Sequence, residues 1–340
     1  MVVSTGVASV AIVDSTHNRY VQVADIEATV LDGIADVIHE VVDGPDGLGE
    51  RLAGYDAIIS WHAVALQREV LAKLTRCVGI VRAAVGFDNI DIAFAAARGI
   101  AVANIPDYGT EEVADHTMAL ILALARNLIN VDRRVKEGIW DWRVAGSLPR
   151  LRGKRLGIVG MGRIGIAVSR RAGCFGLDTG FYDPYAPIGL DKALGVRRLD
   201  TLEELAEVCD IITLHVPLTP ETHHMISEGV LRRMKPEAIL VNTSRGSAIE
   251  ESALIAAVAE GWIGAVGLDV LEDEPRMHPV LRTARNVALT AHSAFYSNES
   301  LVELRTNSAR AVARLLRGEH EPRTVNGVTN SSGHRVFPAL

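Results

Sequence analysis

The chain has 340 residues, of which 48% are hydrophobic and 23% charged, and its formal net charge is −7. This length and composition are typical of a globular protein with two domains, and they exclude a disordered or fibrous chain. The negative charge and the lack of a dense Lys/Arg block argue against nucleic acid as a partner.

The cysteines and the apolar stretches indicate the cellular compartment in which the protein lies. Cys77, Cys174 and Cys209 form no C-x-x-C pair and are odd in number, so we expect neither a disulfide framework nor a zinc site on cysteine. The apolar N-terminus has no Lys or Arg before Arg19 and no cleavage site, which favours a first strand over a signal peptide. The apolar run at residues 118–125 is too short to cross a bilayer. We therefore expect a cytoplasmic protein without membrane contact.

In chain order, the first hundred residues alternate short apolar runs with amphipathic stretches, which predicts β-α-β units and a parallel sheet. The expected strands cover residues 8–13, 36–42, 55–61, 78–84 and 100–105, with helices near 26–34 and 66–74. Residues 109–138 then carry apolar side chains at helical spacing behind Thr110, Glu111 and Glu112, which suit a helix N-terminus. The pattern predicts one long helix that could bridge two domains or two subunits.

A second α/β series begins at Lys154. Its predicted strands lie near residues 155–159, 178–182, 211–215, 239–242, 265–268 and 287–290. Six strands are the size of a complete dinucleotide-binding domain. A helix ending at Gly318 should follow, and we expect residues 329–340 to be a loose tail.

The stretch "RLGIVGMGRIGIAV" places a G-x-G-x-x-G motif between a predicted strand and a predicted helix. Gly160 permits a tight turn, Gly162 lets a pyrophosphate approach the backbone, and Gly165 lets helix and strand pack closely. The amides of Arg163 and Ile164 would bind the anion at the helix N-terminus, where the Arg163 side chain could also reach a phosphate. The alternative is a glycine-rich turn that binds no ligand.

An acidic residue follows this motif at the distance that the motif requires. Asp183, in "GFYDPY", would accept hydrogen bonds from the adenosine ribose, and its charge would repel a 2′-phosphate. NAD is therefore favoured over NADP. The alternative is that Asp183 is a simple turn residue before Pro184.

Three ionisable residues follow the carboxyl ends of predicted strands, namely Arg245, Asp269 and His292. In an open parallel sheet these ends face one crevice. An arginine there suits capture of a carboxylate, and a histidine paired with an acid such as Glu274 suits proton transfer. A 2-oxo acid reductase needs these groups. Taken singly, Arg245 could form a surface salt bridge, Glu274 could be solvated, and His292 could serve packing.

The other histidines considered give weaker evidence of a role in catalysis or binding. His215, also at a strand end, suits a structural or cofactor-lining role. His223 and His224 resemble surface loop residues without acidic or thiol partners at metal spacing, so no metal site is expected.

Several motifs together are recognisable. "VGMGRIG", "FYDPY", "LHVPLTPETHHMI", "VNTSRG", "GLDVLEDEP" and "LTAHSAFYS", with "VRAAVGFDNIDI" and "GTEEVADHT", resemble the D-isomer-specific 2-hydroxyacid dehydrogenases over residues 78–317. "GFDNID", "FYDPY" and the pair Phe295–Tyr296 are most similar to the branch that holds the C-terminal-binding protein corepressors and their bacterial enzyme relatives.

The resemblance implies an α/β fold of two domains with a cleft between them. Residues 108–297 would form a Rossmann-type NAD-binding domain, and residues 1–107 with 298–340 a discontinuous, flavodoxin-like substrate domain. It also implies a homodimer through the helix near residues 112–127.

The resemblance assigns roles as well. Arg245 would hold the substrate carboxylate and polarise the keto oxygen, and His292, hydrogen-bonded to Glu274, would be the acid–base. Asp269 would hold the nicotinamide carboxamide. Further expected contacts are His215 and Thr243 for the cofactor, and Arg82, Ala84, Val85, Gly86 and Phe295 for the substrate.

Some residues depart from the family pattern and leave the substrate open. Ala84 and Val85 stand where relatives often have glycine and a small residue, which narrows the pocket or moves its amide donors. The absence of lysine at Val85 counts against a phosphite dehydrogenase. Glu274 rather than glutamine counts against a formate dehydrogenase, and Phe295 replaces a tryptophan of the corepressors. We expect an NAD-dependent enzyme that interconverts 2-oxo and D-2-hydroxy acids. The alternative is an NAD(H)-sensing dimeric scaffold with little turnover.

Overall fold

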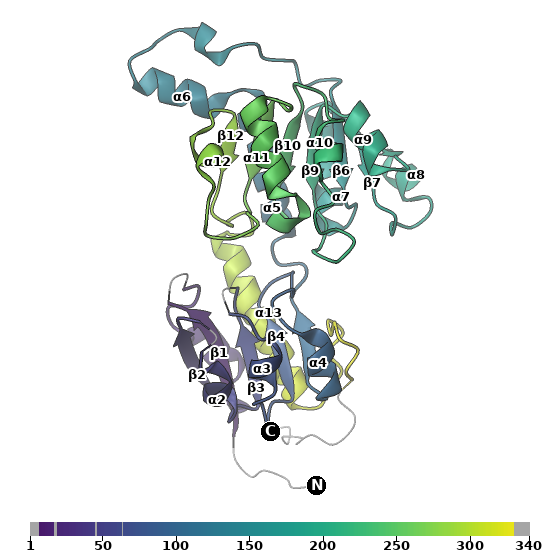
Figure 1. The fold of residues 1–340 in the computed structure, drawn as a ribbon. Helices are drawn as coiled ribbons and strands as arrows, with labels where there is room; N and C mark the ends of the chain where they lie inside the picture. The colour runs from purple at the N-terminus through teal and green to yellow at the C-terminus, as the bar shows by residue number, and fades with distance from the viewer. Residues whose placement is uncertain (1–6, 17–18, 45, 63, 330–340) are drawn as a thin grey trace. The chain divides into compact units, whose positions relative to one another are not determined.

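The computed structural model describes residues 7–16, 19–44, 46–62 and 64–329. The chain divides into two compact units (Figure 1). Unit 1 comprises residues 1–108 and 297–340, and unit 2 comprises residues 109–296. The expected loose tail lies, from residue 330 onward, outside the described residues.

Unit 1 is built on a parallel sheet of five strands in the order β2-β1-β3-β4-β5. The strands β3, β4 and β5 are buried throughout, as expected for a parallel sheet covered on both faces. The elements are β1 (Ala8–Ser15), α1 (Asp25–Val30), β2 (Ala35–Val42), α2 (Leu48–Leu52), β3 (Ala57–Ser60), α3 (Arg68–Leu71), β4 (Gly79–Arg82), α4 (Ile92–Ala97), β5 (Ala101–Asn104) and α13 (Asn298–Leu316).

Alternation along β4 shows how the two faces of this sheet are covered. Ile80 packs into a core cluster with Leu48 and Leu71 of α2 and α3. A Cβ on Gly79 would lie 2.6 Å from a methyl group of Leu315, so α13 packs directly on the opposite face. The last helix of the chain therefore belongs to the core of the first sheet.

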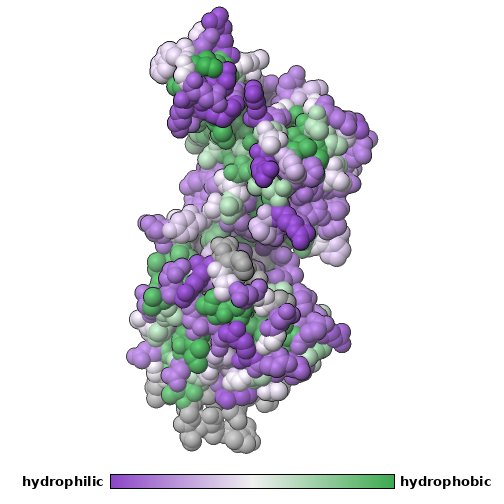
Figure 2. Space-filling view, turned by 60° about the vertical axis from the view of Figure 1, so that its left-hand side comes forward, coloured by the Kyte–Doolittle hydropathy of each residue, from purple (hydrophilic) through white to green (hydrophobic). Residues whose placement is uncertain are grey.

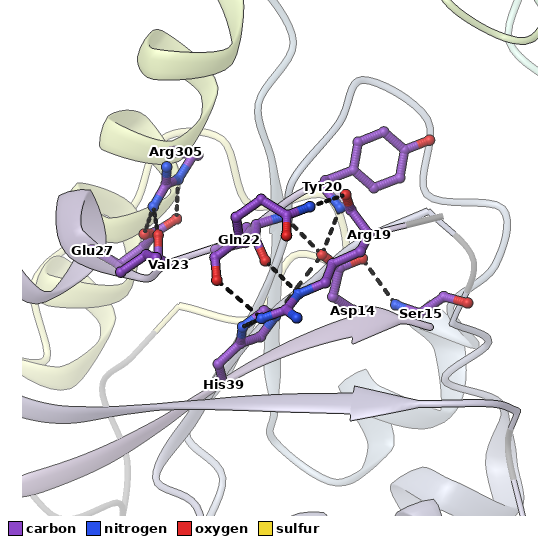
Figure 3. A network of polar contacts seen from close by, with 10 residues as sticks. Asp14, Ser15, Arg19, Tyr20, Gln22, Val23, Glu27, His39 and Arg305 are labelled. Carbon is purple, nitrogen blue, oxygen red and sulfur yellow. Dashed lines mark hydrogen bonds and ion pairs between the residues drawn. The ribbon is translucent and has the colours of Figure 1, made fainter. Parts of the chain in front are cut away.

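Buried carboxylates hold the edge of unit 1 (Figure 3). Asp14, at the end of β1, accepts hydrogen bonds from the amides of Tyr20 at 2.8 Å and Val21 at 2.9 Å. Glu27 of α1 binds the guanidinium of Arg305 on α13 through both oxygens, at 2.9 and 2.6 Å. These contacts fix α13 to the start of the chain.

Unit 2 has a parallel sheet of seven strands in the order β12-β11-β10-β9-β6-β7-β8. The order reverses between β6 and β9, which in an open α/β sheet marks the ligand crevice. The elements are α5 (Thr110–Ala125), α6 (Leu128–Lys136), η1 (Trp142–Ala145), β6 (Arg155–Val159), α7 (Arg163–Cys174), β7 (Asp178–Tyr182), α8 (Leu190–Leu194), β8 (Arg197–Arg198), α9 (Leu202–Val208), β9 (Ile211–Leu214), α10 (Glu228–Leu231), β10 (Ile239–Asn242), η2 (Gly246–Ala248), α11 (Glu251–Glu260), β11 (Ala265–Leu268), α12 (Pro279–Thr283) and β12 (Val287–Leu289).

Helices cover both faces of this sheet. Leu240 of β10 packs into the cluster with α9, α10 and α11, whereas the next residue, Val241, packs into the cluster with α5 and α7. Strand β8 has no counterpart among the predicted strands. It consists of two arginines at the sheet edge, where no apolar run announces a strand.

The single helix predicted over residues 109–138 is wrong, because the chain breaks between α5 and α6. Asn127 adopts φ +50°, a left-handed conformation that asparagine tolerates better than most residues. Its side-chain amide donates to the carbonyl of Ala145 at 3.1 Å, which fixes the break. Hydrophobic spacing continues through this point, so it does not reveal the break.

In the described ranges, no helix has both the length and the apolar character needed to span a membrane.

Candidate active site

The glycine turn of unit 2 has the geometry of a phosphate-binding loop. Gly160 adopts φ +92°, and a Cβ there would lie 2.5 Å from the carbonyl oxygen of His215. A Cβ on Gly165 would lie 2.2 Å from the oxygen of Gly160, so close packing demands glycine at both positions. Gly162 meets nothing within 4 Å and begins α7 without a side-chain cap. The open second glycine at an uncapped helix N-terminus fits a dinucleotide pyrophosphate above Arg163 and Ile164.

Asp183 is locked beside this turn at the end of β7. Its Oδ2 accepts the amide hydrogen of Met161 at 2.9 Å, and its Oδ1 accepts that of Tyr185 at the same distance. A carboxylate has about four acceptor positions, so each oxygen keeps one for a ribose hydroxyl. The residues present therefore fit the adenosine end of a dinucleotide.

His292 and Glu274 form a hydrogen-bonded pair. Nδ1 of His292 lies 2.9 Å from Oε2 of Glu274, with the two side chains 24% and 38% exposed. Burial acts to raise the pKa of Glu274, but the hydrogen bond and charge of His292, the Leu271 amide and the charge of Arg245 outweigh it and hold that pKa below its ordinary value. The pairing leaves Nε2 as the nitrogen on the other side of the imidazole ring.

Hydrogen bonds hold the turn that carries His292 to Asp269, which is 2% exposed. Asp269 Oδ1 accepts from the Thr290 hydroxyl at 2.6 Å and the Ser293 amide at 2.9 Å, and Oδ2 accepts from the Ala294 amide at 2.9 Å. The amide of His292 donates to the carbonyl of Asp269 at 2.8 Å, while its own φ is +50°. Asp269 thus holds the backbone on both sides of His292. One acceptor position of Oδ2 stays for the expected nicotinamide contact, which remains a prediction.

Sequence reasoning missed His116, which extends this network from α5. Its Nε2 lies 2.9 Å from the hydroxyl oxygen of Thr290. Because Thr290 gives its only hydrogen to Asp269, His116 must be the donor, which fixes the proton on Nε2. His116 stands in the motif "GTEEVADHT", but its partner lies 174 residues away. Only the motif itself could have drawn attention to it.

Arg245 begins the turn after β10, and this turn packs on the loop of Glu274. Asn242 holds the turn by donating to the carbonyl of Arg245 at 2.8 Å. A Cβ on Gly246 would lie 1.9 Å from the carbonyl carbon of Leu271, so the two loops touch through backbone. Arg245 is near enough for its charge to lower the pKa of Glu274. Unit 2 therefore brings Arg245, Glu274 and His292 together.

The other predicted cofactor residues lie close by in unit 2. Nε2 of His215 lies 3.1 Å from the Thr213 hydroxyl, and burial lowers the pKa of His215 to about 3, which keeps the ring neutral at pH 7. Thr243 Oγ1 lies 2.9 Å from Oγ1 of Thr117, whose hydrogen goes to a helix carbonyl, so Thr243 donates. Phe295 is 8% exposed and packs against Gly109. For these residues the expected ligand contacts remain predictions.

The predicted substrate turn belongs to unit 1. Arg82 is 3% exposed and donates to Asn89 Oδ1 at 2.9 Å, so its side chain braces the turn. Asn104 holds the carbonyl of Val85 at 2.6 Å, and Ala84 is buried. Among the described residues, none accepts a hydrogen bond from the amides of Val85 or Gly86. Two adjacent amides are thus left for an anion.

Comparison with known proteins decides the family. Residues 118–294 match the family model described as D-isomer specific 2-hydroxyacid dehydrogenase, NAD binding domain. The chain belongs to this family. A glyoxylate reductase from Korarchaeum cryptofilum is 44% identical to this dehydrogenase over 282 residues, which cover 82% of the chain and 84% of the relative.

Solved structures agree with this assignment. A D-lactate dehydrogenase from Aquifex aeolicus in complex with NAD and lactic acid has a TM-score of 0.81 and 30% identity, covering 91% of this chain and 96% of that one. An NADPH-dependent glyoxylate/hydroxypyruvate reductase from Sinorhizobium meliloti, in complex with NADP and malonate, has a TM-score of 0.82 and 27% identity, covering 95% and 98%. This dehydrogenase is an NAD(P)-dependent 2-oxo acid reductase. These three relatives are enzymes, so they give no support to the expected kinship with the corepressors.

One sequence expectation about this dehydrogenase is wrong. His223 and His224 are expected from the sequence to lack acidic partners, yet Nε2 of His224 lies 2.6 Å from Oε1 of Glu272. The loops after β9 and β11 bring the two side chains together from positions 48 residues apart. Spacing along the chain gives no sign of this contact.

Proposed function

We propose that this dehydrogenase uses NADH to reduce a small 2-oxo acid, with glyoxylate as the first candidate. The observation that carries the proposal is the 2.9 Å pair between His292 and Glu274, beside Arg245 and at the carboxyl ends of the unit 2 strands. These are the groups that hydride addition to the carbonyl carbon of a 2-oxo acid requires, namely a proton donor and a cation for the growing oxyanion.

His292 acts as the proton donor in this proposal. Glu274 stays ionised and accepts the Nδ1 hydrogen, which fixes the orientation of the ring and leaves Nε2 for the substrate. Nε2 then gives its proton to the keto oxygen as charge develops there. A bound reduced nicotinamide would supply the hydride.

Arg245 binds the acid in this proposal. A guanidinium can hold a carboxylate through two parallel hydrogen bonds and also offset charge on the keto oxygen. We assign the amides of Val85 and Gly86 to the substrate carboxylate, because they have no acceptor among the described residues. Arg82 keeps this turn in place, and Ala84 with Val85 narrows it, which favours a small acid.

The substrate is tested with a panel of 2-oxo acids and both reduced nucleotides, with chiral analysis of each product. We expect the highest kcat/KM with glyoxylate and D products from larger acids. A clear preference for branched or aromatic 2-oxo acids would contradict the proposal for glyoxylate and leave the family assignment intact.

NAD is proposed over NADP because Asp183 places a negative charge where a 2′-phosphate would lie. Arg198, a cation near Asp183, could pair with a 2′-phosphate. Its guanidinium instead donates to the carbonyls of Ala186 at 3.1 Å and Pro187 at 2.8 Å. The two relatives solved with a nucleotide contain NAD in one case and NADP in the other, so the family leaves the choice open. The ratio of kcat/KM with NADH and NADPH measures it, and a ratio below one would contradict the proposal.

A homodimer is proposed through α5 and α6. One face of α5 is buried within unit 2, but none of the residues of α6 is buried. Trp140 and Trp142, just beyond α6, are 90% and 83% exposed. In Figure 2 the lobe at the top, where Figure 1 places α6, is mostly hydrophilic with small apolar patches, and apolar surface lies just below it. Light scattering should give twice the chain mass, and Trp140→Ser with Trp142→Ser should lower it toward the monomer.

The two units divide the work in this proposal. Unit 2 binds the dinucleotide, as expected for residues 108–297, and unit 1 carries the substrate turn. The unpaired cysteines, two of them buried, fit the expected cytoplasmic location. Isolated unit 2, if it folds, should still bind NADH, which would be measured by the fluorescence of the reduced ring.

A further inference from the structure

A second cluster of ligand-type side chains lies beside the reaction groups of unit 2 and shares none of them. His223 and His224 come from the loop after β9, and Glu272 comes from the loop after β11. One nitrogen from each imidazole and one carboxylate oxygen all lie within 4.8 Å of one another. The two rings stack with their centroids 3.8 Å apart.

We propose that His223, His224 and Glu272 bind a divalent cation of the borderline class, such as Zn²⁺. Two imidazole nitrogens and one carboxylate oxygen are the donor set that zinc accepts, with a fourth position left to water. Ligands about 2.0–2.2 Å from a tetrahedral zinc lie roughly 3.4 Å from each other. The three ligand atoms lie within 4.8 Å of one another, so the side chains must rotate before all three can bind one ion.

The backbone holds the two histidines, while the ring of His223 keeps freedom to turn. The amide of His223 donates to the carbonyl of Thr219 at 2.9 Å, and that of His224 donates to Ser247 at 2.8 Å. His223 is exposed, so its ring can tilt from the stack to share a cation with His224. Glu272 already directs Oε1 to His224 at 2.6 Å, so two of the three ligands are in contact.

Glu272 of this cluster lies on the same loop as Glu274, the partner of the proposed proton donor His292. Glu272 follows Leu271, whose backbone packs on Gly246, and precedes Glu274 by two residues. A cation on Glu272 would therefore hold the loop that carries the partner of His292. The site itself requires none of the catalytic residues.

The test is a zinc titration of the full chain after removal of bound metal with a chelator. Zn²⁺ alone is added in competition with a chromophoric zinc chelator. We expect one zinc per chain, and at least tenfold weaker binding in Glu272→Gln, His224→Gln and His223→Gln. His320→Gln, which alters an exposed histidine of unit 1, is the matched control and should bind zinc like the natural chain.

His223→Gln decides the question, because it changes an exposed side chain and should leave the fold intact. Its thermal unfolding midpoint without zinc should equal that of the natural chain, and zinc should raise the midpoint of the natural chain but not of the variant. Zinc binding that is equal in His223→Gln and the natural chain would overturn the proposal. So would the absence of saturable binding to the natural chain.

Discussion

The hydroxyl of Thr290 donates a 2.6 Å hydrogen bond to the buried carboxylate of Asp269. Because the same carboxylate also accepts the amides of Ser293 and Ala294, it holds the chain before and after His292. The position of His292, the proposed proton donor, therefore depends on the carboxylate of Asp269.

Replacing this acid should disturb the proton donor without touching the imidazole. In Asp269→Asn, three donors would face one oxygen and one NH₂ group, so at least one hydrogen bond is lost and two donors oppose each other. We expect kcat to fall at least about tenfold and the free energy of unfolding to fall by about 1–3 kcal/mol. Steady-state kinetics and urea unfolding measure the two effects. Thr290→Val removes the bonds of the hydroxyl to Asp269 and His116 but leaves both amide bonds to the carboxylate, so kcat should fall less. Unchanged kcat in Asp269→Asn would show that the turn keeps its conformation without this carboxylate.

Removing the proton donor or the substrate cation should nearly abolish turnover. We expect His292→Ala and Arg245→Ala each to lower kcat by at least about a hundredfold, the usual weight of one acid–base or electrostatic group. His320→Ala, at an exposed position of unit 1, is the control and should keep full activity. Retained activity in either purified variant would remove that residue from the mechanism.

The pH profile should report the charge of Glu274. The pKa of Glu274 is held below its ordinary value, so this carboxylate stays ionised across a neutral assay range and becomes protonated only at lower pH. Protonation would remove the charge that Glu274 turns toward Nδ1 of His292, so kcat/KM for the 2-oxo acid should fall on the acid side of the profile. Glu274→Gln carries no charge at any pH, so it should lower kcat/KM at neutral pH and lack this acid limb. An acid limb of the same size and position in both proteins would contradict the pairing.

The contact between the Arg245 turn and the Glu274 loop should be intolerant of a methyl group. In Gly246→Ala the new Cβ would lie 1.9 Å from the carbonyl carbon of Leu271 and 2.3 Å from the amide nitrogen of Glu272, and backbone cannot rotate aside. We expect kcat to fall at least about tenfold, since small displacements of reacting groups are costly. Gly229→Ala, whose new Cβ would lie 3.7 Å from the hydroxyl oxygen of Ser227, should leave kcat unchanged.

A buried carboxylate of unit 1 should make the stability of the fold depend on pH. Glu321 is fully buried and binds Arg323 at 2.7 Å and Arg314 at 3.0 Å. Burial acts to raise its pKa, but the hydrogen bonds and charge of Arg323 and the charge of Arg314 outweigh this and lower the pKa. A lowered pKa stabilises the fold above the ordinary value of 4.5, and this stabilisation is lost as pH falls.

Glu321→Gln should therefore destabilise the protein at pH 7 by roughly 3 kcal/mol, at the low end for a buried pair because both arginines are partly exposed. Urea unfolding at pH 7 and pH 3 measures the difference from the natural chain, which should shrink as pH falls below the ordinary value of 4.5. A difference that is equal at both pH values would show that the charge of Glu321 contributes nothing.

Local pattern predicted much of this protein. The three glycines occupy the conformations and contacts that their spacing indicates, since a phosphate-binding turn is encoded within six residues. Arg245, Glu274 and His292 could be expected to meet because the carboxyl ends of parallel strands share one edge.

Features that depend on distant partners escaped prediction. The strand of Arg197 and Arg198 has no apolar signal, and the break at Asn127 depends on a bond to Ala145. The contacts of His116 with Thr290 and of His224 with Glu272 join residues 174 and 48 positions apart. Tertiary packing alone creates these pairs.

The left-handed backbone at His292 sets two demands against each other. At φ +50° a glycine would rest without strain, whereas a residue with a Cβ costs of order 1 kcal/mol. An imidazole, however, can both give and take a proton near neutral pH, which glycine cannot. Selection for turnover thus keeps at this position a residue that selection for stability alone would discard.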